Sequence, residues 1–173
     1  MVIWLIGLSG AGKTTLANKV VADANNKNLN TVLIDGDVVR EIFGNDLDYS
    51  LEGRLLNANR ICQLGKFLDD QGINVVCAIL SIFPENRDWN RRNLNNYYEV
   101  FIDTPIENLI QRDTKGLYGK YQRGEISAVA GMDIEFSIPD KADLVIRNDE
   151  TESFLLSHSK IIVDILMKKY EKV

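Results

Sequence analysis

The stretch "GLSGAGKTT" occupies residues 7–15 and directly follows the apolar run "VIWLI" at residues 2–6. It satisfies the phosphate-loop pattern G-x-x-x-x-G-K-[ST], in which glycines let backbone N–H groups turn toward phosphate oxygens. The run before it is typical of a buried strand, and the residues after it have the pattern of a helix. Because strand, loop and helix are the context that this pattern requires, the chain is predicted to bind a nucleoside triphosphate.

Two side chains of this loop have expected tasks. Lys13 is expected to reach the β- and γ-phosphates, and the hydroxyl of Thr14 is expected to bind Mg²⁺. The residues of the loop that we expect to contact the nucleotide are Gly7, Ser9, Gly10, Ala11, Gly12, Lys13, Thr14 and Thr15. A nucleoside triphosphate and Mg²⁺ are therefore the predicted cofactors.

Apolar runs and helical patterns alternate along the chain. The predicted strands are residues 2–7, 31–35, 73–80, 98–103 and 143–148, and the predicted helices are 13–24, 53–71, 84–94, 105–112 and 153–172. This alternation predicts an α/β fold, a five-stranded parallel sheet with helices on both faces, in one domain spanning residues 1–173. Residues 113–142 are polar and long for a loop, so we expect a mobile lid there.

Composition narrows the possible partners. The 173 residues carry a net charge of −5, and 45% of them are hydrophobic, so a full core can be buried. An acidic chain argues against binding a nucleic acid polymer or an acidic membrane, but it permits a small anionic ligand. No stretch reaches the roughly 20 apolar residues of a membrane span, and no basic segment precedes the first apolar run. We therefore expect a cytoplasmic protein, with Cys62 and Cys77 reduced and buried.

The residues after the second predicted strand indicate where the phosphate goes. A GTPase would carry a guanine-reading N-K-x-D, which is absent, and an ATPase would carry Glu after residues 100–103, where Thr104 stands instead. The strand at residues 31–35 ends in Asp35-Gly36-Asp37, which places two carboxylates beside the phosphate loop. One carboxylate can orient Mg²⁺-bound water and the other can accept a hydroxyl proton, so the pattern favours a kinase.

Three motifs together resemble the adenylylsulfate (APS) kinases: the loop at residues 7–15, "DGDVVR" at 35–40 and "RDTKGLYGKYQRGEI" at 112–126. The resemblance runs from about residue 2 to residue 148. It implies a P-loop kinase fold and transfer of the γ-phosphate of ATP to the 3′-hydroxyl of a small nucleotide. Because the family is commonly dimeric, it also implies a homodimer.

The resemblance assigns tasks to single residues. Asp37 matches a carboxylate near the acceptor hydroxyl and is the candidate base, and Arg112 matches an arginine against the ATP adenine. Ser81 matches a serine that some descriptions treat as a phosphorylated intermediate; a hydrogen bond to substrate is the milder interpretation. The expected catalytic residues are Asp37, Lys13 and Ser81. The expected acceptor-binding residues are Asp37, Arg40, Arg54, Asn57, Ile79, Leu80, Ser81, Lys115, Gly116, Leu117 and Val129.

Departures from the family pattern concentrate at the acceptor base. "ILSI" at residues 79–82 and "VAG" at 129–131 put Ile79 and Val129 where the resemblance leads us to expect phenylalanines, so the lips of the pocket should be aliphatic. Gly53 stands directly before Arg54, where the resemblance leads us to expect an aspartate. In these departures the chain resembles the branch of APS-kinase-like enzymes in surface-polysaccharide pathways. That resemblance implies cytidine diphosphoramidate, which carries a smaller base, as the favoured acceptor, in capsular polysaccharide phosphoramidate biosynthesis. APS, which would yield PAPS, is the alternative, and a catalytically silent nucleotide-sensing module is the second alternative.

Two further features have ordinary structural interpretations. His158 is the only histidine and lies in the last predicted helix, so a surface or helix-packing role is expected. Arg87, Arg91 and Arg92 belong to the polar helix at 84–94, where a solvated helix face is the expected environment.

Overall fold

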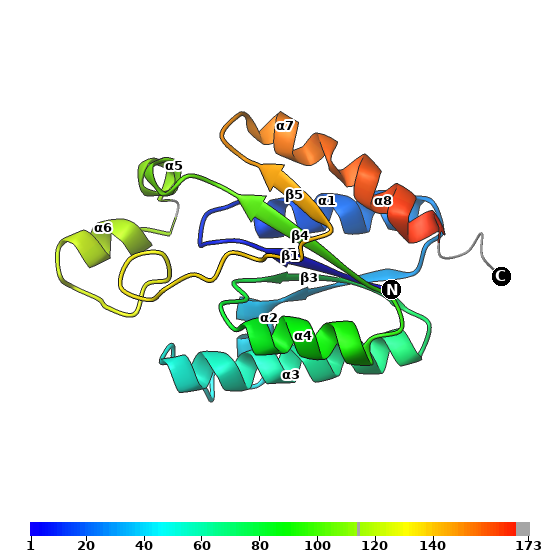
Figure 1. Ribbon diagram of the computed structural model, residues 1–173, viewed down its shortest axis with the longest axis horizontal. Helices are drawn as coiled ribbons and strands as arrows, with labels where there is room; N and C mark the ends of the chain where they lie inside the picture. Colours follow the sequence, from blue (N-terminus) through cyan, green and yellow to red (C-terminus); the bar gives the residue numbers. More distant parts are fainter. Residues whose placement is uncertain (114, 169–173) are drawn as a thin grey trace.

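The computed structural model describes residues 1–113 and 115–168. Its centre is a five-stranded parallel sheet in the order β2-β3-β1-β4-β5 (Figure 1). The strands are β1 (Val2–Ile6), β2 (Thr31–Asp35), β3 (Asn74–Ile79), β4 (Tyr97–Asp103) and β5 (Leu144–Arg147). Each overlaps one of the five predicted runs, so the predicted sheet is confirmed.

Helices cover both faces of the sheet. They are α1 (Lys13–Asn26), α2 (Gly36–Ile42), α3 (Leu51–Asp70), α4 (Pro84–Asn93), α5 (Ile106–Arg112), α6 (Leu117–Gln122), α7 (Glu152–Ser157) and α8 (Ser159–Lys168). In Figure 1, α1, α7 and α8 lie on one face, α2, α3 and α4 lie on the other, and α5 and α6 extend past the end of the sheet. This arrangement confirms the predicted α/β fold. None of the described helices is long and apolar enough to cross a bilayer.

The central position of β1, between two helical layers, explains why its sequence is apolar throughout. Ile3 and Leu5 belong to the core that α1 and α8 cover, whereas Trp4 and Ile6 belong to the core on the other face. All four side chains are fully buried. Successive side chains of a strand point to opposite faces, so a central strand between two helical layers needs an apolar residue at every position.

Helix α2 is absent from the sequence-based prediction. The carboxylate of Asp35 accepts a hydrogen bond from the backbone N–H of Asp37 at 2.9 Å and so caps the helix that begins at Gly36. A glycine and two valines make the segment a poor helix former, which hides it from propensity arguments. The cap and the packing of Val39, which is 3% exposed, stabilise it instead.

The prediction of one C-terminal helix over residues 153–172 is wrong in one respect. Two helices, α7 and α8, replace it and meet at His158. The Ser157 hydroxyl and the His158 ring both bond to the Phe154 carbonyl, at 2.7 and 3.0 Å, while the His158 N–H turns to Leu155 O. These side-chain bonds compete with the helical ladder and tighten the turn. Residues 169–172 of the predicted helix lie outside the described residues.

The expected lid segment contains a short helix, α6. Asp113 accepts hydrogen bonds from the N–H groups of Tyr118 at 3.1 Å and Gly119 at 2.8 Å, which satisfies two donors of its first turn. The buried Tyr118 hydroxyl donates to Ser9 O at 2.9 Å. The segment is thereby attached to the phosphate loop.

Both cysteines behave as predicted. Cys62 lies on α3 and Cys77 on β3, and both are free and buried. Burial raises the pKa of the Cys62 thiol to about 11 and raises the pKa of Cys77 well above its ordinary value. Protonated, buried thiols are packing residues rather than nucleophiles.

Candidate active site

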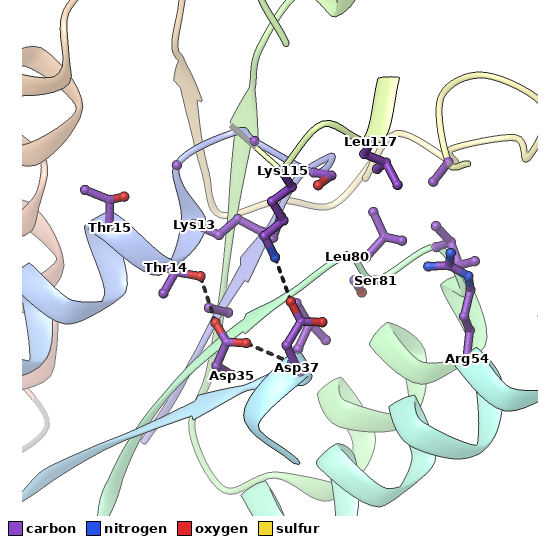
Figure 2. A pocket seen from close by; sticks show the side chains of 18 of the residues that line it. Lys13, Thr14, Thr15, Asp35, Asp37, Arg54, Leu80, Ser81, Lys115 and Leu117 are labelled. Carbon is purple, nitrogen blue, oxygen red and sulfur yellow. Dashed lines mark hydrogen bonds and ion pairs between the residues drawn. The ribbon is translucent and has the colours of Figure 1, made fainter. Parts of the chain in front are cut away.

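A cavity of about 630 Å³ opens at the carboxyl end of the strands, where ligands bind in open α/β sheets (Figure 2). The phosphate loop, the start of α2, helix α3, the loop after β3 and the segment after α5 all contribute to its wall. The sequence-predicted site residues that line it are Ser9, Gly10, Gly12, Lys13, Thr14, Thr15, Asp37, Arg40, Arg54, Asn57, Ile79, Leu80, Ser81, Arg112, Lys115, Leu117 and Val129. Residues predicted from separate motifs are thus brought together in one place.

Three predicted site residues, Gly7, Ala11 and Gly116, do not themselves line the cavity. Gly7 and Ala11 are buried beneath the loop surface, and a Cβ on Gly7 would lie 2.9 Å from the carbonyl oxygen of Ile102. Glycine therefore lets the phosphate loop pass close over β4. Gly116 precedes α6 with φ at 64°, a left-handed conformation that glycine adopts without strain.

The phosphate-loop end of the cavity holds a cation and a pair of hard oxygen atoms. Lys13 Nζ donates to Leu8 O at 2.8 Å, and Thr14 Oγ1 donates to Asp35 Oδ2 at 2.7 Å. Burial, together with the nearby Lys115 ammonium, lowers the pKa of Lys13 to about 8. A hydroxyl beside a carboxylate is a donor set that suits Mg²⁺, which favours oxygen ligands.

An ion pair joins the two sides of the cavity. Lys115 Nζ lies 2.7 Å from Asp37 Oδ2, and Figure 2 shows the two side chains meeting between the phosphate loop and the start of α2. The hydrogen bond to Asp37 raises the pKa of Lys115. A carboxylate and an ammonium group therefore face the same space, where a hydroxyl and a phosphoryl group could meet.

Two arginines lie close to an aromatic ring that the sequence motifs did not identify. Arg40 Nη1 donates to Leu47 O at 3.0 Å and to Asp48 O at 2.9 Å, so this guanidinium holds the loop between α2 and α3. The guanidinium carbons of Arg40 and Arg54 lie 4.6 and 5.5 Å from the Tyr49 ring centroid. Tyr49 lines the cavity. Its only sequence signal is its position between two predicted site arginines.

Arg54 spans from α3 to the lid segment. Its Nε donates to Tyr49 O at 2.8 Å, and its Nη2 donates to Ala128 O at 3.0 Å. Burial is the main cause that lowers the pKa of Arg54, and Arg40 adds to the effect. The guanidinium stays positively charged at neutral pH, so two fixed cations border the cavity.

The prediction of aliphatic lips holds at Ile79 and Val129 but is incomplete. Both residues line the cavity, yet Tyr49 and Phe83 also contribute to the wall. Tyr49 and Phe83 therefore offer aromatic surface to a base, although neither is among the predicted site residues. The pocket thus still has aromatic side chains, although Ile79 and Val129 stand where phenylalanines were expected.

Asn57 and Ser81 bring polar groups to the wall of the cavity. Asn57 Nδ2 donates to Gly36 O at 3.1 Å, whereas its buried Oδ1 has no hydrogen-bond partner among the described residues. The Ser81 hydroxyl accepts a hydrogen bond from Trp4 Nε1 at 3.1 Å and is 7% exposed. Asn57 Oδ1 is thus an acceptor that a ligand hydroxyl could satisfy.

The solvated helix face predicted for α4 is wrong for Arg87. Arg87 is 5% exposed, and its Nη1 donates to Ser81 O at 2.8 Å. Arg91 is half-buried and lies 3.3 Å from Glu99, whereas Arg92 is exposed as predicted. The buried carboxylate of Glu99 on β4 draws the first two arginines inward, which a helix periodicity alone could not reveal.

Known proteins resemble this chain over most of its length. The profile of the adenylylsulphate kinase family matches residues 1–147. A cytidine diphosphoramidate kinase of Campylobacter jejuni is 46% identical over 147 residues, 85% of each chain. An adenylyl-sulfate kinase of Buchnera aphidicola is 39% identical over 171 residues, 98% of this chain and 80% of that one. The Mycobacterium tuberculosis APS kinase CysC, solved in complex with AMPPNP and APS, is 30% identical with a TM-score of 0.87 over 96% of both chains.

Sheet order, phosphate loop and cavity define a P-loop kinase. The chain belongs to the adenylylsulphate kinase family. It is an ATP-dependent phosphotransferase with an alcohol group as acceptor.

Proposed function

We propose that the protein transfers the γ-phosphate of ATP to the 3′-hydroxyl of a small nucleotide, and that cytidine diphosphoramidate is its favoured acceptor. The observation that carries the proposal is the meeting of Thr14, Asp37 and Lys115 in one cavity. Phosphoryl transfer needs a phosphate cradle, an acceptor for the hydroxyl proton and cations around the transferred group. The cavity holds candidates for all three.

At the donor end, the phosphate loop and Lys13 bind the phosphates of ATP, and Arg112 lies against the adenine. Thr14 and Asp35 would hold Mg²⁺. When bound, the ion would supply positive charge that offsets the negative charge developing during phosphoryl transfer. The hydrogen bond between Thr14 and Asp35 supports this assignment, because it already places the two oxygens together.

At the acceptor end, the oxygen of the 3′-hydroxyl attacks the γ-phosphorus, and Asp37 accepts the proton of that hydroxyl. The bond from that phosphorus to the β-bridging oxygen breaks, and ADP leaves. Lys115 then faces the transferred phosphoryl group. We propose that Ser81 forms no phosphorylated intermediate, because its hydroxyl is bonded to Trp4 and direct transfer needs no such intermediate. Arg40, Arg54 and Asn57 hold the 5′ end of the acceptor.

The choice of cytidine diphosphoramidate rests on the pocket and on one relative. Ile79, Leu80 and Val129 line the cavity with aliphatic side chains, which offer no aromatic face, so a purine gains less from stacking here than it would between aromatic rings. The relative that is 46% identical is a cytidine diphosphoramidate kinase. By that resemblance, we place the reaction in capsular polysaccharide phosphoramidate biosynthesis.

APS is the alternative acceptor, and the adenylyl-sulfate kinase relative at 39% identity favours it. Tyr49 and Phe83 could serve a purine as well as a pyrimidine. A nucleotide-sensing module without catalysis is the second alternative. The arrangement of Lys13, Asp37 and Lys115 around one cavity argues against it, because binding alone does not need a base beside a cation.

We also propose that residues 1–173 form one domain, that residues 113–142 act as a closing lid, and that the protein is a homodimer. Lid closure would exclude water and prevent ATP hydrolysis. Leu55, Leu56 and Phe67 on α3 are exposed, and a second copy could cover them. Sedimentation of the purified protein tests the dimer.

Acceptor-dependent ADP formation tests the proposed activity. Purified protein with ATP and Mg²⁺ is assayed with cytidine diphosphoramidate, APS, CDP, CMP and no acceptor. We expect ADP above the control with cytidine diphosphoramidate, and a 3′-phosphorylated product by mass spectrometry. ADP at the rate of the control with every acceptor, while ATP still binds, would instead support the nucleotide-sensing module.

A further inference from the structure

Arg87 is a buried cation that the proposed mechanism does not use. It lies on α4, is 5% exposed, and donates from Nη1 to the carbonyl oxygen of Ser81 at 2.8 Å. Burying a guanidinium is costly unless its surroundings compensate for the lost water. The charged guanidinium is therefore held by the backbone of the loop that follows β3.

The compensating charge comes from β4. Glu99 is 1% exposed, and its Oε1 lies 3.9 Å from Arg87 Nε. Its Oε2 accepts a hydrogen bond from the Tyr97 hydroxyl at 2.9 Å and lies 3.3 Å from Arg91 Nη2. Glu99 is thus held in place, and it in turn holds Arg87 against Ser81.

A second hydrogen bond to Ser81 comes from β1, the strand next to β4. Trp4 on β1 is the register partner of Glu99 on β4, and its Nε1 donates to Ser81 Oγ at 3.1 Å. The hydroxyl and the carbonyl of one residue are therefore both fixed, by groups anchored at adjacent positions of the sheet.

Ser81 needs this support because its backbone is strained. Its φ is +55°, in the left-handed region that residues with side chains rarely adopt. Such conformations persist only where the surroundings determine them. The residues on either side, Ile79, Leu80, Ile82 and Phe83, all line the cavity, so the conformation of Ser81 sets how that wall faces the acceptor.

We propose that Arg87, backed by Glu99, is a positioning residue for the acceptor: it holds Ser81 in its left-handed conformation and so fixes the cavity wall formed by residues 79–83. This inference rests on the proposed function for the identity of the ligand that meets the wall. The phosphate loop has separate supports, since Asn148 Nδ2 donates to Ala11 O and Tyr118 donates to Ser9 O. Arg87 should therefore govern the KM of the acceptor and leave the KM of ATP unchanged.

Four variants of the full chain test the role. Arg87→Met removes the donor and the charge, and Arg87→Lys keeps a charge and one donor. The double variant R87M/E99Q removes both buried charges together. Arg91→Met is the matched control, because Arg91 lies one turn along α4 and contacts the same Glu99 but not the Ser81 carbonyl. For each we measure the KM for cytidine diphosphoramidate, APS and ATP, the thermal midpoint, and hydrogen exchange of residues 79–83.

Arg87→Met should raise the acceptor KM by about tenfold or more, the effect of losing a hydrogen bond to a charged donor, with the ATP KM unchanged. Arg87→Lys should recover part of this loss. R87M/E99Q should recover thermal stability relative to R87M but not the acceptor KM, because the Ser81 carbonyl stays unpaired. Arg91→Met should leave the acceptor KM unchanged.

Recovery of the acceptor KM in R87M/E99Q would overturn the proposal, because Arg87 would then serve only to neutralise Glu99. Equal rises in the KM of acceptor and ATP would also overturn it. Hydrogen exchange separates this inference from the proposed function: faster exchange of residues 79–83 in R87M, but not in R91M, is expected even without an acceptor. If the wild-type protein phosphorylates no acceptor in the panel, the proposed function fails. The contact between Arg87 and Ser81 is tested separately: unchanged hydrogen exchange of residues 79–83 in R87M would refute its role in holding Ser81.

Discussion

Lys115 Nζ and Asp37 Oδ2 lie 2.7 Å apart, although the residues belong to segments 78 positions apart in the chain. Both side chains are more than half exposed, at 63% and 52%, so the ion pair contributes little to stability. Its importance is positional. It places a cation beside the candidate base, at the point where the hydroxyl and the γ-phosphate of the proposed reaction would meet.

The candidate base makes the first prediction. Asp37→Asn keeps the shape of the side chain but cannot accept the hydroxyl proton as a carboxylate does, so we expect kcat to fall by about 10²- to 10⁴-fold. The Kd of ATP, measured by calorimetry, should change little. Asp46→Asn is the control, since Asp46 is an exposed aspartate of the neighbouring loop that pairs with Arg60. If D37N kept the kcat of wild type, Asp37 would not be the base.

The lowered pKa of Lys13 predicts how ATP affinity depends on pH. Burial holds this pKa near 8 in the free protein, and bound phosphates favour the charged ammonium. Below that pH, Lys13 is already charged when ATP arrives. Above it, binding must first take up a proton, so the Kd of MgATP should rise as pH increases through about 8. Calorimetry without acceptor, on both sides of this pH, gives the measurement.

Lys115→Met provides the control for that titration. The Lys115 ammonium contributes to the lowered pKa of Lys13, so its removal should move the rise in Kd to higher pH. An ATP affinity that is independent of pH in wild type would mean that Lys13 does not titrate there. An unshifted midpoint in K115M would remove Lys115 as a cause.

Tyr49 should matter to the acceptor more than to ATP. Its ring lies close to the guanidinium groups of Arg40 and Arg54 and lines the cavity, so it can offer aromatic surface to a base. Tyr49→Ala should weaken acceptor binding by roughly 1–3 kcal/mol, the range measured for one base on one aromatic side chain. Tyr49→Phe keeps the ring and should retain most of the affinity. Equal effects of Y49A and Y49F on the acceptor KM would assign the role to the hydroxyl instead.

Gly53 explains one departure from the family pattern. A Cβ at this position would lie 2.5 Å from the carbonyl and carboxylate oxygens of Asp48, so the loop carrying Tyr49 packs directly on the first turn of α3. Gly53→Ala should therefore lower the free energy of unfolding by about 1–3 kcal/mol through overpacking. In denaturant titrations, a G53A protein as stable as wild type would show that this packing is loose.

Gly65 gives a matched control in the same helix. It is buried on α3, but a Cβ there would meet no atom within 4 Å. Gly65→Ala should raise the free energy of unfolding by about 0.5–1 kcal/mol, because alanine loses less backbone entropy in a helix. The opposite signs expected for G53A and G65A separate the close approach of Asp48 from a general effect of alanine.

Local patterns in the sequence were sufficient to predict the sheet and the position of the phosphate loop between β1 and α1. Continuous apolar runs identify strands buried on both faces, and the phosphate loop carries its own spacing. The features that were missed depend on contacts between distant residues. Helix α2 relies on the Asp35 cap, Arg87 is drawn inward by Glu99, and Tyr49 reaches the cavity because Gly53 lets its loop approach. Such effects leave no periodic signal in the chain.

The ratio of kcat/KM for cytidine diphosphoramidate to kcat/KM for APS shows whether the cavity serves a cytidine nucleotide or APS. Both are measured with the same preparation at saturating ATP and Mg²⁺. Cytidine diphosphoramidate should be the better substrate by at least about tenfold, a difference of roughly 1.4 kcal/mol in transition-state binding. A ratio in favour of APS would contradict this expectation and would make the protein an adenylyl-sulfate kinase.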